Sequence, residues 1–301
     1  MNKAKSVAAV VVTYNRKELL LENIAALSAQ TAAECCDIII IDNASSDGTG
    51  ETLRPLADEG KIIYINTGSN LGGAGGFQYG IRYAAEHGYD FVWVMDDDCI
   101  PRPDVLQLFL EKDRQLGDLY GFLSSKVLWK DGSVCTMNVQ RETLTKNVES
   151  FEEKVISVEM ASFVSLFIPV RIVREFGLPI KEFFIWTDDW EYTRRISRLY
   201  PCFLLTDSVV VHKSKSNIGA NIATESADRL DRFNYLYRND VYLYRREGWK
   251  GFLYEFVRLN WHILRVLLKA KDNKLKRIKL IIGGTVKGLS FKPEIEFAKT
   301  E

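Results

Sequence analysis

The chain has 301 residues, 47% of them hydrophobic, and its 40 basic and 40 acidic residues give a formal net charge of zero. This apolar content is enough for one large packed domain, or for one domain with an appendage. A zero net charge provides no global field that would select nucleic acid, so we expect no nucleic-acid partner.

The five cysteines are odd in number and form no C-x-x-C pair, which is typical of reduced thiols rather than of a disulfide framework. Residues 1–6 contain no apolar core of a signal peptide, and no uninterrupted apolar stretch is long enough to span a bilayer. The expected location is therefore the cytoplasm.

Strand-like and helix-like segments alternate through the first hundred residues. Apolar, β-rich runs predict strands at 7–12, 38–41, 62–65 and 91–95. Helical spacing predicts a helix near 19–27, turn chemistry at 45–48 precedes a second, and a glycine-rich loop at 71–76 precedes a third that ends near His87. This alternation favours an α/β fold with a mostly parallel central sheet.

The second half of the chain is less regular until a long helical pattern begins near residue 228. We expect an α/β domain over residues 1–225 and a helical region over residues 226–301. The segments expected between are a polar excursion at 130–154, strand-like residues at 155–170, a short helix at 171–176, a charged helix from 188 to about 199, and strands at 203–205 and 209–211.

Three aspartates, Asp96, Asp97 and Asp98, directly follow the apolar run 91–95. The carboxyl ends of buried strands are where an open α/β sheet places its ligands. Adjacent carboxylates repel one another, and a divalent cation such as Mg²⁺ would relieve that repulsion while binding phosphates. Taken alone, the triplet fits a solvated acidic turn equally well.

Polar residues end two other predicted strands. Asp42 could accept the imide N–H of uracil or bind a ribose hydroxyl, or it could cap the next helix in an Asx-turn. Thr13 and Tyr14 end the first strand on the same edge of the sheet, where Tyr14 could stack on a nucleobase or simply be an exposed turn residue.

The segment from Asn70 to Gly76, which includes Gly72, could let backbone amides approach a pyrophosphate closely. It is not a dinucleotide fingerprint, because G-x-G-x-x-G is absent and the segment does not follow the first strand. Arg82, in the helix that follows, could reach a phosphate or be an ordinary surface charge.

Asp188, Asp189 and Glu191 open a predicted helix, where acids are also favoured by the helix dipole. One of these carboxylates could be a general base that deprotonates a hydroxyl. Trp186, just before them, offers a flat apolar face to a sugar ring. His212 follows an apolar strand and could complete a metal site or be structural.

Together these pieces resemble the inverting, GT-A-type glycosyltransferases of family 2, and within them the bacterial galactofuranosyltransferases. The likeness to the galactofuranosyltransferases lies in the glycine-rich segment 70–77, the triple aspartate with Pro101 beyond it, and the Trp-x-Asp-Asp motif. The stretches that match the family, in its order, are Val10–Arg16, Ile41–Gly48, Met95–Asp98 and Trp186–Glu191.

The resemblance implies a role for each candidate residue. Asp189 would be the catalytic base, Asp188 and Glu191 would position acceptor hydroxyls, and Trp186 would contact the acceptor. Asp42 would hold the uridine, and Asp96, Asp98 and His212 would bind Mn²⁺ or Mg²⁺. The remaining donor-site residues would be Thr13, Tyr14, Asn70, Gly72, Arg82 and Asp97.

The activity implied is the metal-dependent transfer of galactofuranose from UDP-galactofuranose to a cell-surface glycan, such as an O-antigen or capsule, with a β-linkage. A rhamnosyltransferase using dTDP-rhamnose is the alternative within the enzyme class. A nucleotidyltransferase would normally need a basic, glycine-rich signature early in the chain, where this one has Thr13, Tyr14 and Asn15. A non-catalytic protein that binds nucleotide sugars is the alternative from a different class.

The C-terminal helical pattern allows two interpretations. Glu255, Arg258, His262, Arg265 and Lys269 form a narrow polar stripe on an otherwise apolar helix. The helix could cover the sheet and bury its apolar face, also in a homo-oligomer. Alternatively, the seven basic residues and one acid between positions 265 and 279 would suit an interfacial helix at the cytoplasmic face of the inner membrane, near a lipid-linked acceptor.

Overall fold

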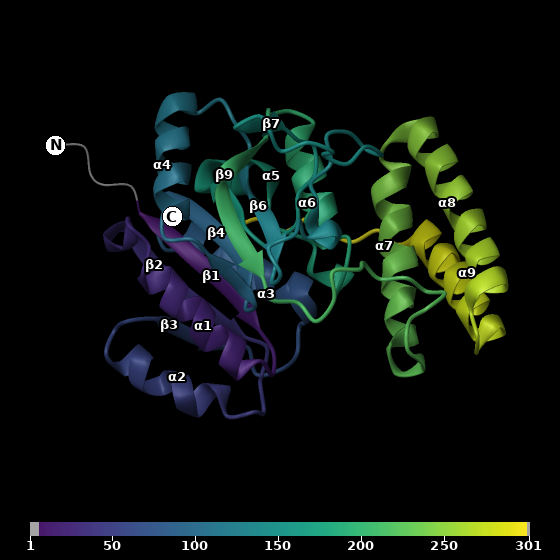
Figure 1. Ribbon diagram of the computed structural model, residues 1–301, viewed down its shortest axis with the longest axis horizontal. Helices are drawn as coiled ribbons and strands as arrows, with labels where there is room; N and C mark the ends of the chain where they lie inside the picture. Colours follow the sequence, from purple (N-terminus) through teal and green to yellow (C-terminus); the bar gives the residue numbers. More distant parts are fainter. Residues whose placement is uncertain (1–5, 300–301) are drawn as a thin grey trace.

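The computed structural model describes residues 6–299, in which nine strands form one sheet (Figure 1). The strands lie in the order β3-β2-β1-β4-β8-β6-β9-β5, and β7 pairs with β9. The sequence analysis expected no signal-peptide core in residues 1–6. Of these residues, only Ser6 lies within the described range. The strands are β1 Val7–Thr13, β2 Cys36–Asp42, β3 Ile63–Asn66, β4 Phe91–Asp96, β5 Cys99–Pro101, β6 Leu123–Trp129, β7 Val155–Ser157, β8 Leu166–Pro169 and β9 Phe203–His212.

The helices cover both faces of the sheet, as the continuous apolar strands require. Alternate residues of β1 face opposite sides: Val10 packs in one apolar core with Ile81 of α3, and Val11 packs in the other with Leu20 of α1. The α-helices are α1 Lys17–Ser28, α2 Thr49–Asp58, α3 Gly72–Glu86, α4 Val105–Leu116, α5 Val170–Phe176, α6 Asp188–Ser197, α7 Phe233–Arg245, α8 Gly248–Lys269 and α9 Lys274–Ser290.

The expected α/β fold is confirmed, but the sheet is mixed rather than mostly parallel. The ladders β1–β2, β2–β3, β1–β4 and β6–β9 are parallel. The ladders β4–β8, β6–β8, β5–β9 and β7–β9 are antiparallel. The βαβ rule holds only for the first four strands, because only among these does each connecting helix join two parallel strands.

Three local expectations need correction. The strand-like stretch 155–170 is two short strands, β7 and β8, separated by irregular chain, and the two late strands are the single strand β9. The glycine-rich segment is not a loop, since α3 already begins at Gly72. A Cβ at Gly76 would lie 2.5 Å from Val12 Cγ1 and one at Gly80 would lie 2.2 Å from Val10 Cγ1, so these glycines let α3 pack closely on β1.

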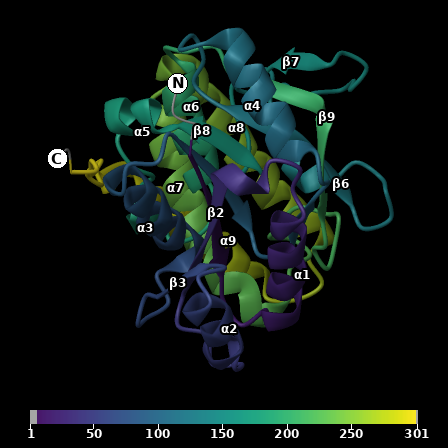
Figure 2. The same cartoon turned by 90° about the vertical axis from the view of Figure 1, so that its left-hand side faces the viewer.

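Helices α7, α8 and α9 lie together beside the sheet, at the side farthest from β2 and β3 (Figure 1). Seen from the opposite end of the molecule, they lie behind the sheet (Figure 2). They share an apolar core that includes Tyr237, Val266 and Ile281. The chain then returns toward the sheet, where Ala298 is buried and Glu296 accepts a hydrogen bond from Leu178. The C-terminal region is therefore tied to the sheet at both of its ends.

Candidate active site

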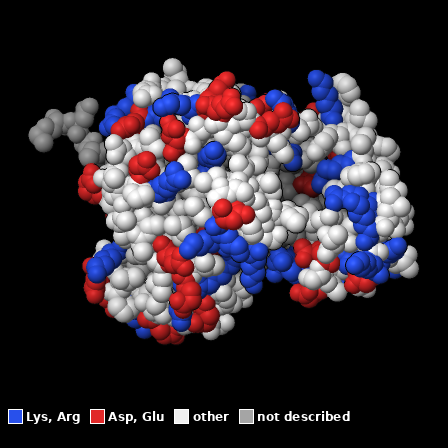
Figure 3. All heavy atoms as spheres, viewed as in Figure 1, with Lys and Arg blue, Asp and Glu red and all other residues white. Residues whose placement is uncertain are grey.

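A cleft of about 880 Å³ lies between the carboxyl edge of the sheet and the C-terminal helices. A hollow between these two parts is visible in the space-filling view, with acidic and basic side chains on its walls (Figure 3). The register of the parallel strands places Thr13 opposite Asp42, and Val12 opposite Asp96, at one edge of the sheet. Side chains far apart in sequence meet here because neighbouring parallel strands end together.

One wall of the cleft holds a cluster of possible metal ligands. Asp96 ends β4, and the antiparallel pairing of Cys99 with His212 brings the end of β9 beside it. Ligand atoms of Asp96, Asp98, Cys99 and His212 all lie within 4.8 Å of one another. The Nε2 atom of His212 is 3.0 Å from Oδ1 of Asp98.

The donor set of this cluster fits a divalent cation. Carboxylate oxygens and an imidazole nitrogen are suitable ligands for Mn²⁺. The Nδ1 atom of His212 lies 2.8 Å from Asn138 Oδ1, which can only accept, so Nδ1 carries the proton and Nε2 faces the carboxylates. Burial raises the pKa of the Cys99 thiol well above its usual value, which makes this fourth group a poor ligand.

Without a cation, protein charges balance the aspartates. Burial opposes the charged form of His212, but its hydrogen bond with Asp98 prevails and raises the imidazole pKa to about 10. Burial also disfavours ionised Asp98, yet the hydrogen bond and charge of His212 lower the pKa of that carboxyl. Burial raises the pKa of Asp96, where repulsion from Asp98 adds to the effect.

Arg16 is a cleft residue to which the sequence analysis gave no role. Its Nη1 lies 2.6 Å from Asp98 Oδ2 and 3.4 Å from Asp97 Oδ1. Thr13 donates a hydrogen bond to Asp97 Oδ2 at 2.7 Å, and burial raises the pKa of Asp97 to about 7. The available signal was the position of Arg16 three residues after the end of β1, in one of the stretches that match the family.

The opposite wall holds Asp188 and Asp189, at the first turn of α6. Asp188 is buried, and the adjacent Asp189 is half-buried. Burial, together with the charge of Asp96, raises the pKa of Asp188 to about 7. Burial and the neighbouring Asp188 raise the pKa of Asp189 well above its usual range. Within residues 6–299 neither carboxylate forms an ion pair.

The segment that leads into α6 has an unusual backbone. Phe184, Trp186 and Thr187 have φ angles of 63°, 65° and 68°, which bulky residues rarely adopt. Helix α7 holds this segment in place. Asn239 Nδ2 donates to the carbonyls of Phe183 and Trp186 at 3.0 and 2.9 Å.

A second side chain of α7, next to Asn239, also holds the segment before α6. Asp240 Oδ1 accepts a hydrogen bond of 2.6 Å from the Thr187 hydroxyl, directly before the aspartate pair. No local sequence pattern points to either α7 residue, because their partners are backbone and side-chain groups more than fifty residues away.

The other predicted site residues divide into two groups. The first group lines the cleft and consists of Tyr14, Asn70, Gly72 and Trp186. The same cleft is lined by the two aspartate clusters, Thr13 and His212. The remaining three, Asp42, Arg82 and Glu191, do not line it and are engaged by other parts of the protein.

The engaged residues have defined partners. Asp42 is fully buried and accepts hydrogen bonds from the Tyr64 hydroxyl at 2.6 Å and from the Ser45 amide at 2.8 Å. Arg82 pairs with Glu296 at 2.5 Å, and Glu191 pairs with Arg195 at 3.1 Å. A uracil contact by Asp42 would require Tyr64 to move, and a phosphate contact by Arg82 would require it to leave Glu296.

Comparison with known proteins identifies the class of enzyme. Residues 8–126 match the model of glycosyl transferase family 2. Two solved structures share the fold at 13% identity. Residues 1–349 of S. aureus TarS in complex with UDP-GlcNAc superpose with a TM-score of 0.56, covering 95% of this chain and 73% of that one. GalNAc-T7 with UDP, GalNAc and Mn²⁺ gives 0.60, covering 81% and 50%. Residues 8–126 therefore match a glycosyltransferase domain of family 2, and the similarities support a family 2 glycosyltransferase with a GT-A-like fold.

Within that family the chain is similar to galactofuranosyltransferases. The galactofuranosyltransferase GlfT1 of Mycolicibacterium smegmatis is 26% identical to it over 288 residues, which cover 88% of this chain and 91% of that protein. The similarity therefore extends past the family domain, through the aspartate pair of α6 and into the C-terminal helices.

Proposed function

We propose that the protein transfers galactofuranose from UDP-galactofuranose to a glycan acceptor, in a metal-dependent reaction that inverts the anomeric centre and gives a β-linkage. The observation that carries the proposal is one cleft with two acidic groups of different character. One group fits a divalent cation, and the other lies across the cleft with no cationic partner. The similarity to GlfT1 over most of both chains supports galactofuranose as the sugar.

The donor would bind at the carboxyl edge of the sheet. Asp96, Asp98 and His212 would hold Mn²⁺ or Mg²⁺, and the bound ion would neutralise charge that develops on the UDP leaving group. Tyr14, Asn70 and Gly72 would line the nucleotide side of the same cleft. Asp97, held by Thr13 and Arg16, would keep the acidic loop in position.

Asp189 would act as the base on the other wall. It removes the proton of an acceptor hydroxyl while that oxygen forms a bond to C1 of galactofuranose, and the bond from C1 to the UDP oxygen breaks on the opposite face. Asp188 would orient the acceptor hydroxyls and Trp186 would pack against the acceptor ring. Glu191, paired with Arg195, would act by fixing α6 rather than by touching the acceptor.

The acceptor would be a cell-surface glycan on a lipid carrier, which places the enzyme at the cytoplasmic face of the membrane. Homo-oligomerisation stays a prediction of the sequence. The acceptor would enter from the side of the C-terminal helices, because Arg229 and Arg232 line that part of the cleft and could neutralise a carrier phosphate.

A donor panel tests the proposal. Purified protein with Mn²⁺ is assayed for binding and hydrolysis of UDP-galactofuranose, other UDP-sugars and dTDP-rhamnose. Selective, Mn²⁺-dependent turnover of UDP-galactofuranose is expected. Preference for dTDP-rhamnose would show that the donor is this sugar nucleotide and not UDP-galactofuranose. Binding of UDP with no turnover on any acceptor would favour a nucleotide-sugar-binding protein instead.

A further inference from the structure

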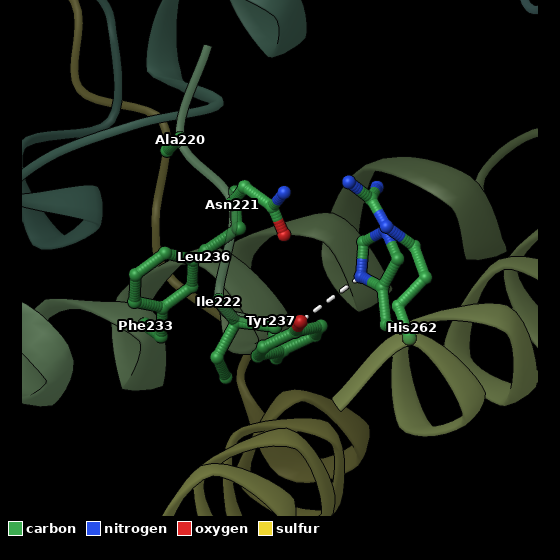
Figure 4. Close-up of a pocket in the computed structure, with 8 residues that line it drawn as sticks. Ala220, Asn221, Ile222, Phe233, Leu236, Tyr237 and His262 are labelled. Carbon is green, nitrogen blue, oxygen red and sulfur yellow. Dashed lines mark hydrogen bonds between the residues drawn. The ribbon is translucent and has the colours of Figure 1, made fainter. Parts of the chain in front are cut away.

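Helix α8 turns the polar residues of its central part toward the protein and much of its apolar surface outward. Glu255 is buried, and Arg258 pairs with Asp240 of α7. His262 Nδ1 lies 2.9 Å from the hydroxyl of Tyr237, also on α7 (Figure 4). This is the reverse of an ordinary surface helix, which buries its apolar stripe and exposes its polar one.

The outward face of α8 is apolar except for Asn260 in its middle and Lys250 near its start, which are also exposed. Its apolar residues recur at three- and four-residue steps, so they share one side of the helix, and each is between 43% and 72% exposed. Single exposed apolar residues are common, but a contiguous face of this kind marks an interaction surface. The outer face of α8 consists of Trp249, Phe252, Leu253, Phe256, Val257, Trp261, Leu264, Leu267 and Leu268.

Basic side chains follow this outer face at its C-terminal end. Lys269, Lys271, Lys274 and Lys279 are all exposed. In the described chain, residues 6–299, none of the four has a carboxylate within ion-pair distance. Their charge is therefore available to an anionic partner.

Anionic lipid suits this combination better than a second copy of the chain. The outer face carries no carboxylate, so a second copy packed through the same face would leave these lysines without an anionic partner. Tryptophan and phenylalanine beside lysine are typical of helices that lie in the headgroup boundary of a bilayer. Within residues 6–299 no helix is long and apolar enough to cross a membrane.

We propose that the outer face of α8 docks on the surface of a bilayer that contains anionic phospholipid. The helix lies in the interface, with its aromatic residues among the acyl chains and the lysines at the headgroups. Because Arg258 and His262 of the same helix line the cleft, docking places the cleft beside the lipid surface. This binding does not depend on which sugar nucleotide the enzyme uses.

Vesicle co-sedimentation of the full chain tests the docking. We expect binding to vesicles of phosphatidylglycerol mixed with phosphatidylcholine, and much weaker binding to phosphatidylcholine alone or at high salt. The double variant Phe252→Glu/Phe256→Glu should lose binding at least about tenfold. The matched control is Leu119→Glu/Leu199→Glu, which makes the same kind of change at two exposed leucines near the sheet and should bind as the wild type does.

Quenching of tryptophan fluorescence by brominated lipids is a second test, and it requires only mild substitutions. The wild type should be quenched, and Trp249→Phe/Trp261→Phe should lose most of that quenching while it still sediments with the vesicles. Absence of wild-type binding to anionic vesicles would overturn the proposal, as would equal loss in the leucine control. A wild-type dimer that Phe252→Glu/Phe256→Glu converts to a monomer, with no lipid binding by either, would assign the face to a second copy instead.

Discussion

Asp98 and Asp189 belong to different acidic groups of the cleft, and their surroundings shift the pKa values of these two carboxyls in opposite directions. Asp98 has the guanidinium of Arg16 and the imidazole of His212 as partners, and its pKa is lowered. Asp189 has only its neighbour Asp188 and backbone amides, and its pKa is raised well above the usual range.

The difference shows how one cleft can prepare carboxylates for two tasks. A carboxylate that is ionised and surrounded by cations is suited to exchange those partners for a metal ion. A buried carboxyl with no cation near it has a high proton affinity, which is the property required of a group that accepts a proton from a hydroxyl.

Asp189→Asn should have the largest effect, because it removes the proposed proton acceptor and leaves the metal-binding carboxylates in place. The amide cannot accept the proton, so we expect transfer to fall by about 10³-fold or more, with UDP binding almost unchanged. Steady-state kinetics and calorimetric titration with UDP measure the two effects. A variant that retains wild-type turnover would show that the base lies elsewhere.

Asn239→Ala should displace the aspartate pair without touching it. The side chain holds the carbonyls of Phe183 and Trp186, and its loss should let the left-handed segment relax. We expect kcat to fall by about 10²-fold, with a smaller change in the donor KM. Asn260→Ala, on α8, is a matched control, since Asn260 bonds only to a carbonyl of its own helix. An effect on donor KM alone would contradict a positioning role for Asn239.

Asn138→Ala should weaken the metal side of the cleft. Without the acceptor at Nδ1, His212 loses the contact that orients Nε2 toward the carboxylates. We expect affinity for Mn²⁺ to fall by about 10- to 100-fold, read from electron paramagnetic resonance of free Mn²⁺ rather than from activity. Asn138→Asp, which keeps an acceptor, should restore most of the affinity. Equal Mn²⁺ affinity in Asn138→Ala and the wild type would remove Asn138 from the site.

The smallest effect is expected in the pH dependence of stability of metal-free protein. The pKa of Asp188 is about 7 in the fold against an ordinary 3.8, so its neutral form is favoured by folding. This stabilisation is complete below pH 3.8 and is lost as the pH rises to about 7. The melting temperature should therefore fall by roughly a few degrees over that window.

Asp188→Asn should reduce the slope of melting temperature against pH without removing it. The pKa of Asp97 is also raised to about 7, so its ionisation acts in the same direction. Thermal unfolding followed by circular dichroism in a chelating buffer provides the measurement. An unchanged slope in the variant would show that Asp188 is ionised throughout this pH range in the folded protein.

Much of the fold could be predicted because strands and helices leave local periodic patterns. The four apolar runs of the first hundred residues became β1 to β4 within two residues at each end. Both acidic motifs were located at element ends, which is where the structure places them. The glycine-rich segment was misassigned as a loop, because glycine composition does not tell a flexible loop from a helix that must pack closely on a strand.

Amino-acid pattern by itself thus determined the α/β class, the positions of the acids and the polar stripe of α8. Tertiary structure alone decided that His212 meets Asp98 through the pairing of β5 with β9, and that Arg16, Asn138 and Asn239 support the cleft. It also decided that Glu255, Arg258 and His262 of that stripe face inward, whereas Lys269 at its end is exposed. Periodicity records which residues share a side of an element, whereas contacts between distant segments determine what that side faces.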